Sequence, residues 1–161
     1  MTDHLRVAPF TGYRYSEAKI PDLSQVIAPP YDMIPPAMQA ELHERHPQNI
    51  VRLILSRHEG DDGFGDRYER AAAAYRNWKE NGILVRDRVP SIYAYRQDYE
   101  WGGHAFQRLG FIARVALTEF GEGAFPHEST LKGPKADRLK LLTASRANFS
   151  CIFSLFIDDD K

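Results

Sequence analysis

The 161-residue chain is nearly balanced in charge, since 21 lysines and arginines against 22 aspartates and glutamates give a formal net charge of −1. Hydrophobic residues make up 43% of the sequence, which is enough for a buried core, and the single cysteine, Cys151, excludes both an internal disulfide and a cysteine-based zinc site. The sequence has neither clustered basic residues nor a long apolar run, so we expect no nucleic-acid partner, no membrane span and no signal peptide, and a cytoplasmic location.

The first segments of the chain are predicted to be extended. Residues 5–10, LRVAPF, have the composition of a short strand. Residues 24–36 include four prolines, which restrict the backbone and predict a stiff loop. Tyr31 and Asp32 follow the first pair of prolines, so Asp32 is a candidate preset carboxylate for metal binding or proton transfer. A plain rigid turn, including one with a cis proline, is the competing interpretation.

A helix and a strand are predicted next. Residues 35–46 begin with two prolines, which suit the first turn of a helix, and the apolar residues that follow keep helical spacing. His43 and His46 are expected at the surface of this helix. Residues 49–56, NIVRLILS, have the apolar composition of a buried strand.

The clearest helix is predicted within residues 61–85. Asp66 can cap its start, and Gly82 can end it with Ile83 folding back as a hydrophobic partner. Five residues form an apolar stripe at helical spacing: Tyr68, Ala71, Ala72, Tyr75 and Trp78. This stripe is expected to face the core.

The second half of the chain predicts a hairpin, a helix and a strand. Residues 90–117 contain two β-rich runs separated by Gly102–Gly103, which indicates a long β-hairpin. Residues 133–148 have the pattern of a helix with Pro134 in its first turn. Residues 149–157, FSCIFSLFI, are apolar on both faces and are predicted as a buried strand that includes the lone cysteine.

These elements predict one α+β domain over residues 1–161, with a mixed β-sheet and helices packed around it. A strand that is apolar on both faces normally lies at the centre of a sheet. Because this one falls four residues before the end of the sequence, we expect the chain to be the N-terminal portion of a longer protein.

Reactive side chains concentrate at the start of the last predicted helix. The unpaired N–H groups and the dipole of a helix start favour an anion such as phosphate. Lys135 and Arg138 lie three residues apart there, so both can reach the same anion.

The same segment offers groups for metal binding and proton transfer. Glu128 and Asp137 carry the hard oxygen donors that Mg²⁺ prefers, and either can accept a proton from a hydroxyl group. His127 titrates near neutrality and can move a proton or contact phosphate. A well-solvated helix start with no ligand is the alternative.

Four stretches resemble an uncharacterised prokaryotic family, domain-of-unknown-function family 1015. They are APPYDMI, YERAAAAYRNWKENGIL, IYAYRQ and GxxxxPHExTxxxPKxDRLxLLxAxxANxxxIFxLF, and the likeness runs from about Arg6 to Phe156. The family is in turn distantly similar to the fold shared by the nucleotide-binding domain of the partition protein ParB, sulfiredoxin and free-serine kinases. In that group a motif at a helix start cradles nucleotide phosphates. The resemblance therefore implies a nucleotide-linked activity, with Glu128 and Arg138 in the key positions.

The leading hypothesis is a Mg²⁺-dependent phosphotransferase that moves a phosphoryl group from ATP or ADP to a small hydroxyl compound. The predicted catalytic residues are Glu128, His127 and Asp32. The predicted nucleotide-binding residues are Thr130, Lys135, Arg138 and Asn148, and the predicted metal ligands are Glu128 and Asp137. Two alternatives stay open: a nucleotide-binding regulatory or interaction module without turnover, and a structural domain whose activity lies in a C-terminal part of a longer protein.

Overall fold

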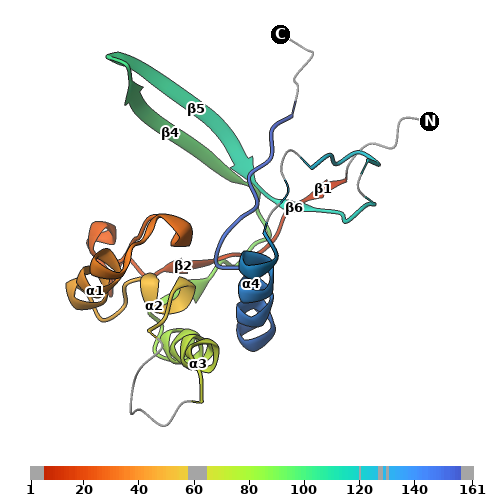
Figure 1. Ribbon diagram of the computed structural model, residues 1–161. Coiled ribbons are helices and arrows are strands. Elements are labelled where there is room, and N and C mark those ends of the chain that lie inside the picture. The colour runs from red at the N-terminus through yellow and green to blue at the C-terminus, as the bar shows by residue number, and fades with distance from the viewer. Residues whose placement is uncertain (1–5, 58–64, 120, 127–128, 130, 157–161) are drawn as a thin grey trace. The chain divides into compact units, whose positions relative to one another are not determined.

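The computed structural model of the protein describes residues 6–57, 65–119, 121–126, 129 and 131–156. Contacts within the chain group its residues into two compact units. The strand unit consists of Met1–Arg14 and Val85–Leu131, and the helical unit consists of Tyr15–Leu84 and Lys132–Lys161. Each unit is described by itself (Figure 1).

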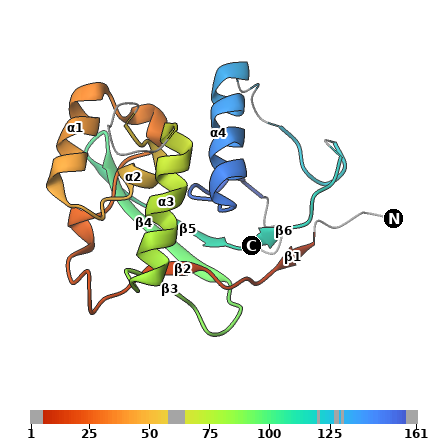
Figure 2. The same ribbon diagram turned by 90° about the horizontal axis from the view of Figure 1, so that it is seen from below.

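The helical unit contains the α-helices of the described chain: α1 (Pro36–Arg45), α2 (Val51–Ile54), α3 (Arg67–Glu80) and α4 (Lys132–Ser145). Two 3-10 helices, η1 (Leu23–Gln25) and η2 (Tyr31–Met33), precede α1, and the described peptide bonds there are all trans. Helix α2 packs against α1 and α3, and α4 packs against α3 (Figure 2). Helix α4 therefore packs into the same unit as helices that lie far from it in the sequence.

Helix α3 begins and ends at the predicted residues. The Asp66 side chain accepts hydrogen bonds from two backbone N–H groups of the first turn, at 2.8 and 2.9 Å. At the other end, Gly82 has a φ of 61°, and the Ile83 N–H donates to the Trp78 carbonyl at 2.8 Å. This is the Schellman arrangement, in which a glycine takes the left-handed conformation that ends a helix.

Two apolar clusters form the core of the helical unit. Their buried members are Ile34, Leu42, Val51 and Ile54 in one cluster, and Leu53, Tyr75, Trp78 and Leu84 in the other. Phe149, just beyond α4, packs against both clusters. Since full burial of a large apolar side chain contributes about 1.5–3 kcal/mol, these clusters are the main source of stability in this unit.

Helix α2 replaces the strand predicted over residues 49–56, so that prediction is wrong. Asn49 accounts for the difference. Its buried amide donates to two carbonyls of the preceding loop, at 2.9 and 3.1 Å, and its oxygen accepts from the Val51 N–H at 3.0 Å. A side-chain oxygen used in this way supports a helical turn, and a short apolar run has no periodicity that separates a strand from a helix.

The prediction of a strand over residues 149–157 is also wrong, for the residues of this segment that the structure describes. Residues 151–156 have no regular secondary structure, and Ile152 and Leu155 are exposed. Cys151, expected in the core, is exposed as well. A strand needs a neighbouring strand to pair its backbone, and no described strand pairs with this segment.

Helix α1 turns one predicted surface residue inward. His43 is 6% exposed, and neither ring nitrogen has a hydrogen-bond partner among the described residues. Burial, helped by the positive charge of Arg52, lowers the pKa of His43 to about 4, so the ring is neutral at neutral pH. His46, just after the helix, is half-buried and accepts a hydrogen bond from the Gln48 N–H at 3.1 Å.

The strand unit contains the long β-hairpin that the sequence predicts. Strands β4 (Tyr93–Trp101) and β5 (His104–Ile112) pair antiparallel in continuous register. Gly102 and Gly103 join them with φ values of 59° and 77°. A two-residue type I′ turn requires positive φ at both positions, which glycine adopts at no steric cost.

Shorter strand pairs complete the described sheets. The predicted opening strand forms as β1 (Val7–Ala8), which pairs antiparallel with β6 (Arg114–Val115). Strand β2 (Tyr13–Tyr15) pairs with β3 (Leu84–Arg86), and the chain passes from one unit to the other within these two strands.

Helices together with small antiparallel sheets make this an α+β fold, as predicted. The described strands form three two-stranded sheets in place of one mixed sheet. None of the helices in the described part of the chain is long and apolar enough to cross a membrane.

Candidate functional site

Helix α4 starts in the segment that the sequence singled out. Lys132 is its first residue and Pro134 its third, where the missing N–H of proline removes no helical hydrogen bond. Lys135 is exposed, whereas Asp137 and Arg138 are half-buried. The helix thus presents its lysines, Lys135 among them, to solvent and turns the Asp137–Arg138 pair towards the protein.

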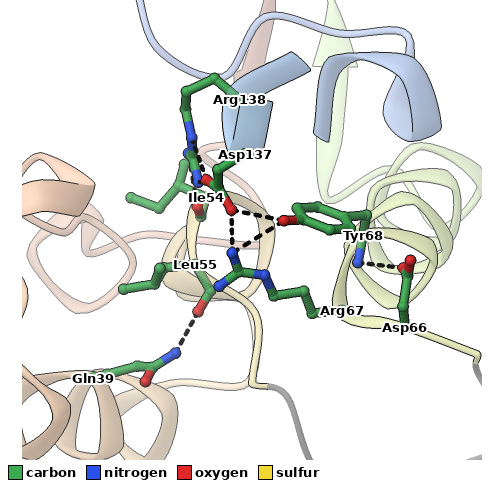
Figure 3. A network of polar contacts seen from close by, with 8 residues as sticks. All are labelled: Gln39, Ile54, Leu55, Asp66, Arg67, Tyr68, Asp137 and Arg138. Carbon is green, nitrogen blue, oxygen red and sulfur yellow. Dashed lines mark hydrogen bonds and ion pairs between the residues drawn. The ribbon is translucent and has the colours of Figure 1, made fainter. Parts of the chain in front are cut away.

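The Asp137 carboxylate is the centre of a polar network (Figure 3). Its Oδ1 accepts a hydrogen bond from the Tyr68 hydroxyl at 2.7 Å and forms an ion pair with Arg67. Its Oδ2 accepts a hydrogen bond from Arg138 Nε at 2.8 Å and also pairs with Nη2 of the same guanidinium. Arg67 and Tyr68 come from the first turn of α3, so the network ties that turn to α4.

Charge is held in this network away from most of the solvent. The side chains of Asp137, Arg67 and Arg138 are 18%, 19% and 25% exposed, and two guanidinium groups with one carboxylate leave a net charge of +1. Burial alone raises the pKa of Asp137, but hydrogen bonds from Arg138 and Tyr68 and the charges of both arginines hold this pKa below its ordinary value. The stabilisation by these pairs is therefore present at neutral pH and is lost as the pH falls through the lowered pKa.

Arg138 connects the network to the proline-rich loop. Its Nη1 donates to the Ile54 carbonyl at 2.9 Å, and its guanidinium lies over the Tyr31 ring, 3.9 Å from the ring centroid. Asp32 follows Tyr31 in η2 and is exposed, with no hydrogen bond or ion pair to a described residue. The two segments that the sequence marked separately as candidate sites thus meet at Arg138.

A small cavity lies beside Arg67. It is lined by residues of α2, α3 and α4, among them Leu53, Ala71 and Leu141, and measures about 10 Å³. Arg67 Nε is buried and has no hydrogen-bond partner in the described part of the chain. The space is on the order of what one water needs, so a ligand as large as a nucleotide has to bind outside it.

The predicted site residues fall into three groups. His127, Glu128 and Thr130 lie outside the residues that the structure describes. Asp137 and Arg138 are brought together with the loop that carries Asp32. Lys135 and Asn148 are both exposed, the first on α4 and the second beyond its C-terminal end.

The Asp137 and Asp32 carboxylates differ in how accessible their oxygens are to Mg²⁺. Both oxygens of Asp137 are engaged by guanidinium groups, whereas the Asp32 carboxylate is exposed. Residues 6–57, 65–119, 121–126, 129 and 131–156 contain no group of three His, Cys, Asp or Glu side chains that could hold a metal ion. Mg²⁺ bound with a nucleotide needs only one or two carboxylates besides phosphate and water, and Asp32 fits that requirement.

Sequence reasoning missed three members of the network. The sequence marks Tyr68 only as a member of the apolar stripe of α3 and gives no signal for the role of its hydroxyl. Tyr31 had a signal, because it directly precedes Asp32 in the loop that the prolines restrict. Arg67 had none, since its partner Asp137 lies 70 residues away in the sequence.

A family model described as "Protein of unknown function (DUF1015)" matches residues 7–161. The chain belongs to this family. The DUF1015 match covers the proline-rich loop and the starts of α3 and α4, and it confirms the family predicted from the sequence motifs. No curated protein and no solved structure matches the chain significantly.

Proposed function

We propose that this DUF1015 protein is a nucleotide-dependent phosphotransferase that uses Mg²⁺ and acts on a small hydroxyl compound. The observation that supports the proposal is the contact of Arg138 with Tyr31, 3.9 Å from guanidinium to ring centroid. Through it, the exposed carboxylate next to Tyr31 shares a site with the helix that carries Lys135. The distant likeness to ParB, sulfiredoxin and free-serine kinases that the sequence motifs suggest would imply a nucleotide-linked activity at a helix start.

In this proposal the Asp137 network is a platform for the site. Arg138 donates with Nε and Nη2 to Asp137 and with Nη1 to the Ile54 carbonyl, so all three nitrogens are already engaged. These contacts use three of the five N–H donors of the guanidinium, so two remain with which Arg138 can bind a phosphate group. Arg138 also holds the Tyr31 ring, which directly precedes Asp32, against α4.

Besides Arg138, which keeps its predicted role in nucleotide binding, the proposed reactive groups are exposed side chains. Phosphoryl transfer depends on positioning and charge neutralisation more than on covalent chemistry by the protein. Lys135 neutralises the nucleotide phosphates, and Asp32 binds the metal or accepts the proton of the attacking hydroxyl. Mg²⁺, when bound, lowers the charge repulsion on the transferred group. His127, Glu128, Thr130 and Asn148 keep their predicted roles in proton transfer, metal binding and nucleotide binding.

The proposal is tested first by calorimetric titration of the folded chain with ATP, ADP, CTP and GTP, each with and without Mg²⁺. One nucleotide should bind in a Mg²⁺-dependent manner. Lys135→Ala and Asp32→Asn should each weaken that binding by roughly tenfold to a hundredfold, the effect of losing one charged interaction. Arg45→Ala is the matched control, because it removes a surface charge that pairs with Glu41 on α1 and should leave the affinity unchanged.

Transfer is then measured as phosphorylated product with a panel of small hydroxyl compounds, free serine included. Accumulation of product in the wild type and its loss in Asp32→Asn would support the enzyme. Tight nucleotide binding without product for any acceptor would instead favour a nucleotide-binding interaction module. If no nucleotide binds the folded chain, the proposal is wrong.

A further inference from the structure

Strand β4 has an outer edge that no other described strand pairs with. Its register with β5 is continuous over nine residue pairs, without a bulge. The strand contains neither proline nor lysine, which proteins commonly place on an exposed edge, but it carries three charged residues, Arg96, Asp98 and Glu100, so a strand that pairs with it needs complementary charges. A two-stranded hairpin is marginally stable by itself, so pairing of this edge with a further strand would stabilise it.

The hairpin turn decides which backbone groups point outward. In a two-residue turn the flanking residues, here Trp101 and His104, form a hydrogen-bonded pair. Orientation alternates along a strand, so the odd-numbered residues of β4 direct their N–H and C=O groups to β5. The even-numbered residues, Ala94, Arg96, Asp98 and Glu100, direct theirs to the free edge.

The sequence of β4 is complementary to itself when it is read backwards. Around Gln97, the strand reads YAYR on one side and DYEW on the other. Antiparallel pairing of two copies about Gln97 places Arg96 opposite Asp98 of the other copy, and places Tyr95 opposite Tyr99. It also places Tyr93 opposite Trp101. The pairs that exchange backbone hydrogen bonds in this register are even-numbered on both strands, which matches the groups that point outward.

We propose that β4 is a homodimer interface, in which two copies of the chain pair antiparallel about a two-fold axis at Gln97. A two-fold interface must be self-complementary. The charges meet this condition twice, because Arg96 of each copy lies opposite Asp98 of the other. Shifting the two-fold axis by one residue would place Asp98 opposite Asp98, or Arg96 opposite Arg96. Like charges directly opposite each other are unfavourable, so the charges select the register about Gln97.

The side chains that this dimer uses are accessible. The Arg96 and Asp98 side chains are 65% and 58% exposed, and they form an exposed ion pair with each other that can exchange for pairs between copies. On the opposite face, Tyr99 stacks on Phe106 with centroids 5.5 Å apart. Trp101 is 78% exposed. The dimer would extend this aromatic surface across both copies and cover the tryptophan.

The charge pattern gives the first test, which is sedimentation velocity over a wide range of protein concentration. The wild type should dimerise. Arg96→Asp alone, or Asp98→Arg alone, should raise the dimer dissociation constant about tenfold, since each creates two like-charge pairs. The double variant that carries both changes should restore the wild-type dissociation constant. A circular dichroism melt of each variant checks that it is folded.

A disulfide test does not depend on affinity. Two Gln97→Cys residues should form an intermolecular disulfide in a Cys151→Ser background, because non-hydrogen-bonded antiparallel pairs hold their Cα atoms about 4.5 Å apart. Ala94→Cys in the same background is the matched control. In the proposed register its two copies are offset by six residues, roughly 20 Å, and should not crosslink.

Three results would overturn the proposal. The first is a monomer at every concentration together with no disulfide at position 97. The second is a dimer that the double charge exchange fails to restore. The third is equal crosslinking at positions 94 and 97, which would mean that contact between the strands has no fixed register.

Discussion

The helical unit and the strand unit are stabilised by different forces. Within the described residues, every buried apolar side chain belongs to the helical unit. In the strand unit, even the aromatic residues Tyr95, Tyr99 and Phe106 on the hairpin are exposed. The helical unit therefore depends on hydrophobic burial, whereas the strand unit depends on its backbone ladders and on individual polar contacts.

One group of these polar contacts lies at the base of the hairpin. The Tyr93 hydroxyl donates to Asp87 at 2.5 Å and accepts from the Gly12 N–H at 2.8 Å. Arg14 donates to the other Asp87 oxygen at 2.8 Å. The hydrogen bonds from Tyr93 and Arg14 lower the pKa of Asp87, which keeps this carboxylate charged at neutral pH. These hydrogen bonds thus stabilise the base of the hairpin, where the strand unit has no buried apolar side chain among the described residues.

The largest effect should follow from emptying the core of the helical unit. Trp78 is 4% exposed and packs with Leu53, Tyr75 and Leu84. Trp78→Ala should lower the free energy of unfolding by about 3–5 kcal/mol, because it removes buried apolar area and leaves a cavity. Urea denaturation measures this loss. Arg76→Ala, an exposed change on the same helix, should stay within roughly 0.5 kcal/mol, and an equally small loss for Trp78→Ala would contradict a core held by burial.

A smaller effect should come from His43, a buried polar side chain of the helical unit without a hydrogen-bond partner for its ring among the described residues. The pKa of His43 is lowered to about 4 in the folded state, with Arg52 and then Arg57 adding to the effect of burial. Between about pH 6.5 and this value the unfolded chain binds a proton that the folded chain does not, so stability falls as the pH drops through this window.

His43→Leu should remove this pH dependence, which amounts to roughly 1–3 kcal/mol between neutral pH and pH 4. Unfolding free energies of both proteins, measured at several pH values, isolate the contribution because the carboxylates titrate alike in both. Parallel pH profiles would show that His43 is not buried in a neutral form.

The smallest effect is expected in the strand unit, at the hairpin turn. Gly103 has a φ of 77°, where a side chain costs about 1 kcal/mol or somewhat more. Gly103→Ala should therefore speed amide hydrogen exchange in β4 and β5 severalfold. Gly133→Ala is a control for which no faster exchange is expected. A Cβ at position 133 meets open space, and alanine favours the helix α4 in which this residue lies. Faster exchange in α4 after the Gly103 change would mean that the two units do not differ in this way.

Elements with their own start and stop signals could be predicted from the sequence. Helix α3 has Asp66 and Gly82 at its ends, and the hairpin has two glycines at its turn, so local chemistry defines both. The segment around Val51 has only apolar composition, and a buried amide two residues earlier decides for a helix. Residues 151–156 have the composition of a strand, but a strand forms only where another strand pairs with it.

The candidate site shows the same division. Charged residues close together in the sequence, such as Lys135 and Arg138, mark the start of α4 as a candidate site. The partners of Asp137 and Arg138 could not be read from the sequence, because packing of α4 against α3 and η2 brings them together. Since a long-range ion pair has no spacing rule, only the folded chain reveals which carboxylate is committed and which is open to a ligand.

The contrast between the units also has an optical consequence. The chain has two tryptophans, one in each unit: Trp78 is almost fully buried and Trp101 is largely exposed. An indole in an apolar core emits at shorter wavelength than one in water, and an aqueous quencher such as iodide reaches only the exposed ring. The intrinsic fluorescence of the unlabelled protein therefore reports on the two units as separate signals. Shielding of the exposed indole would also register pairing of β4 with a second copy.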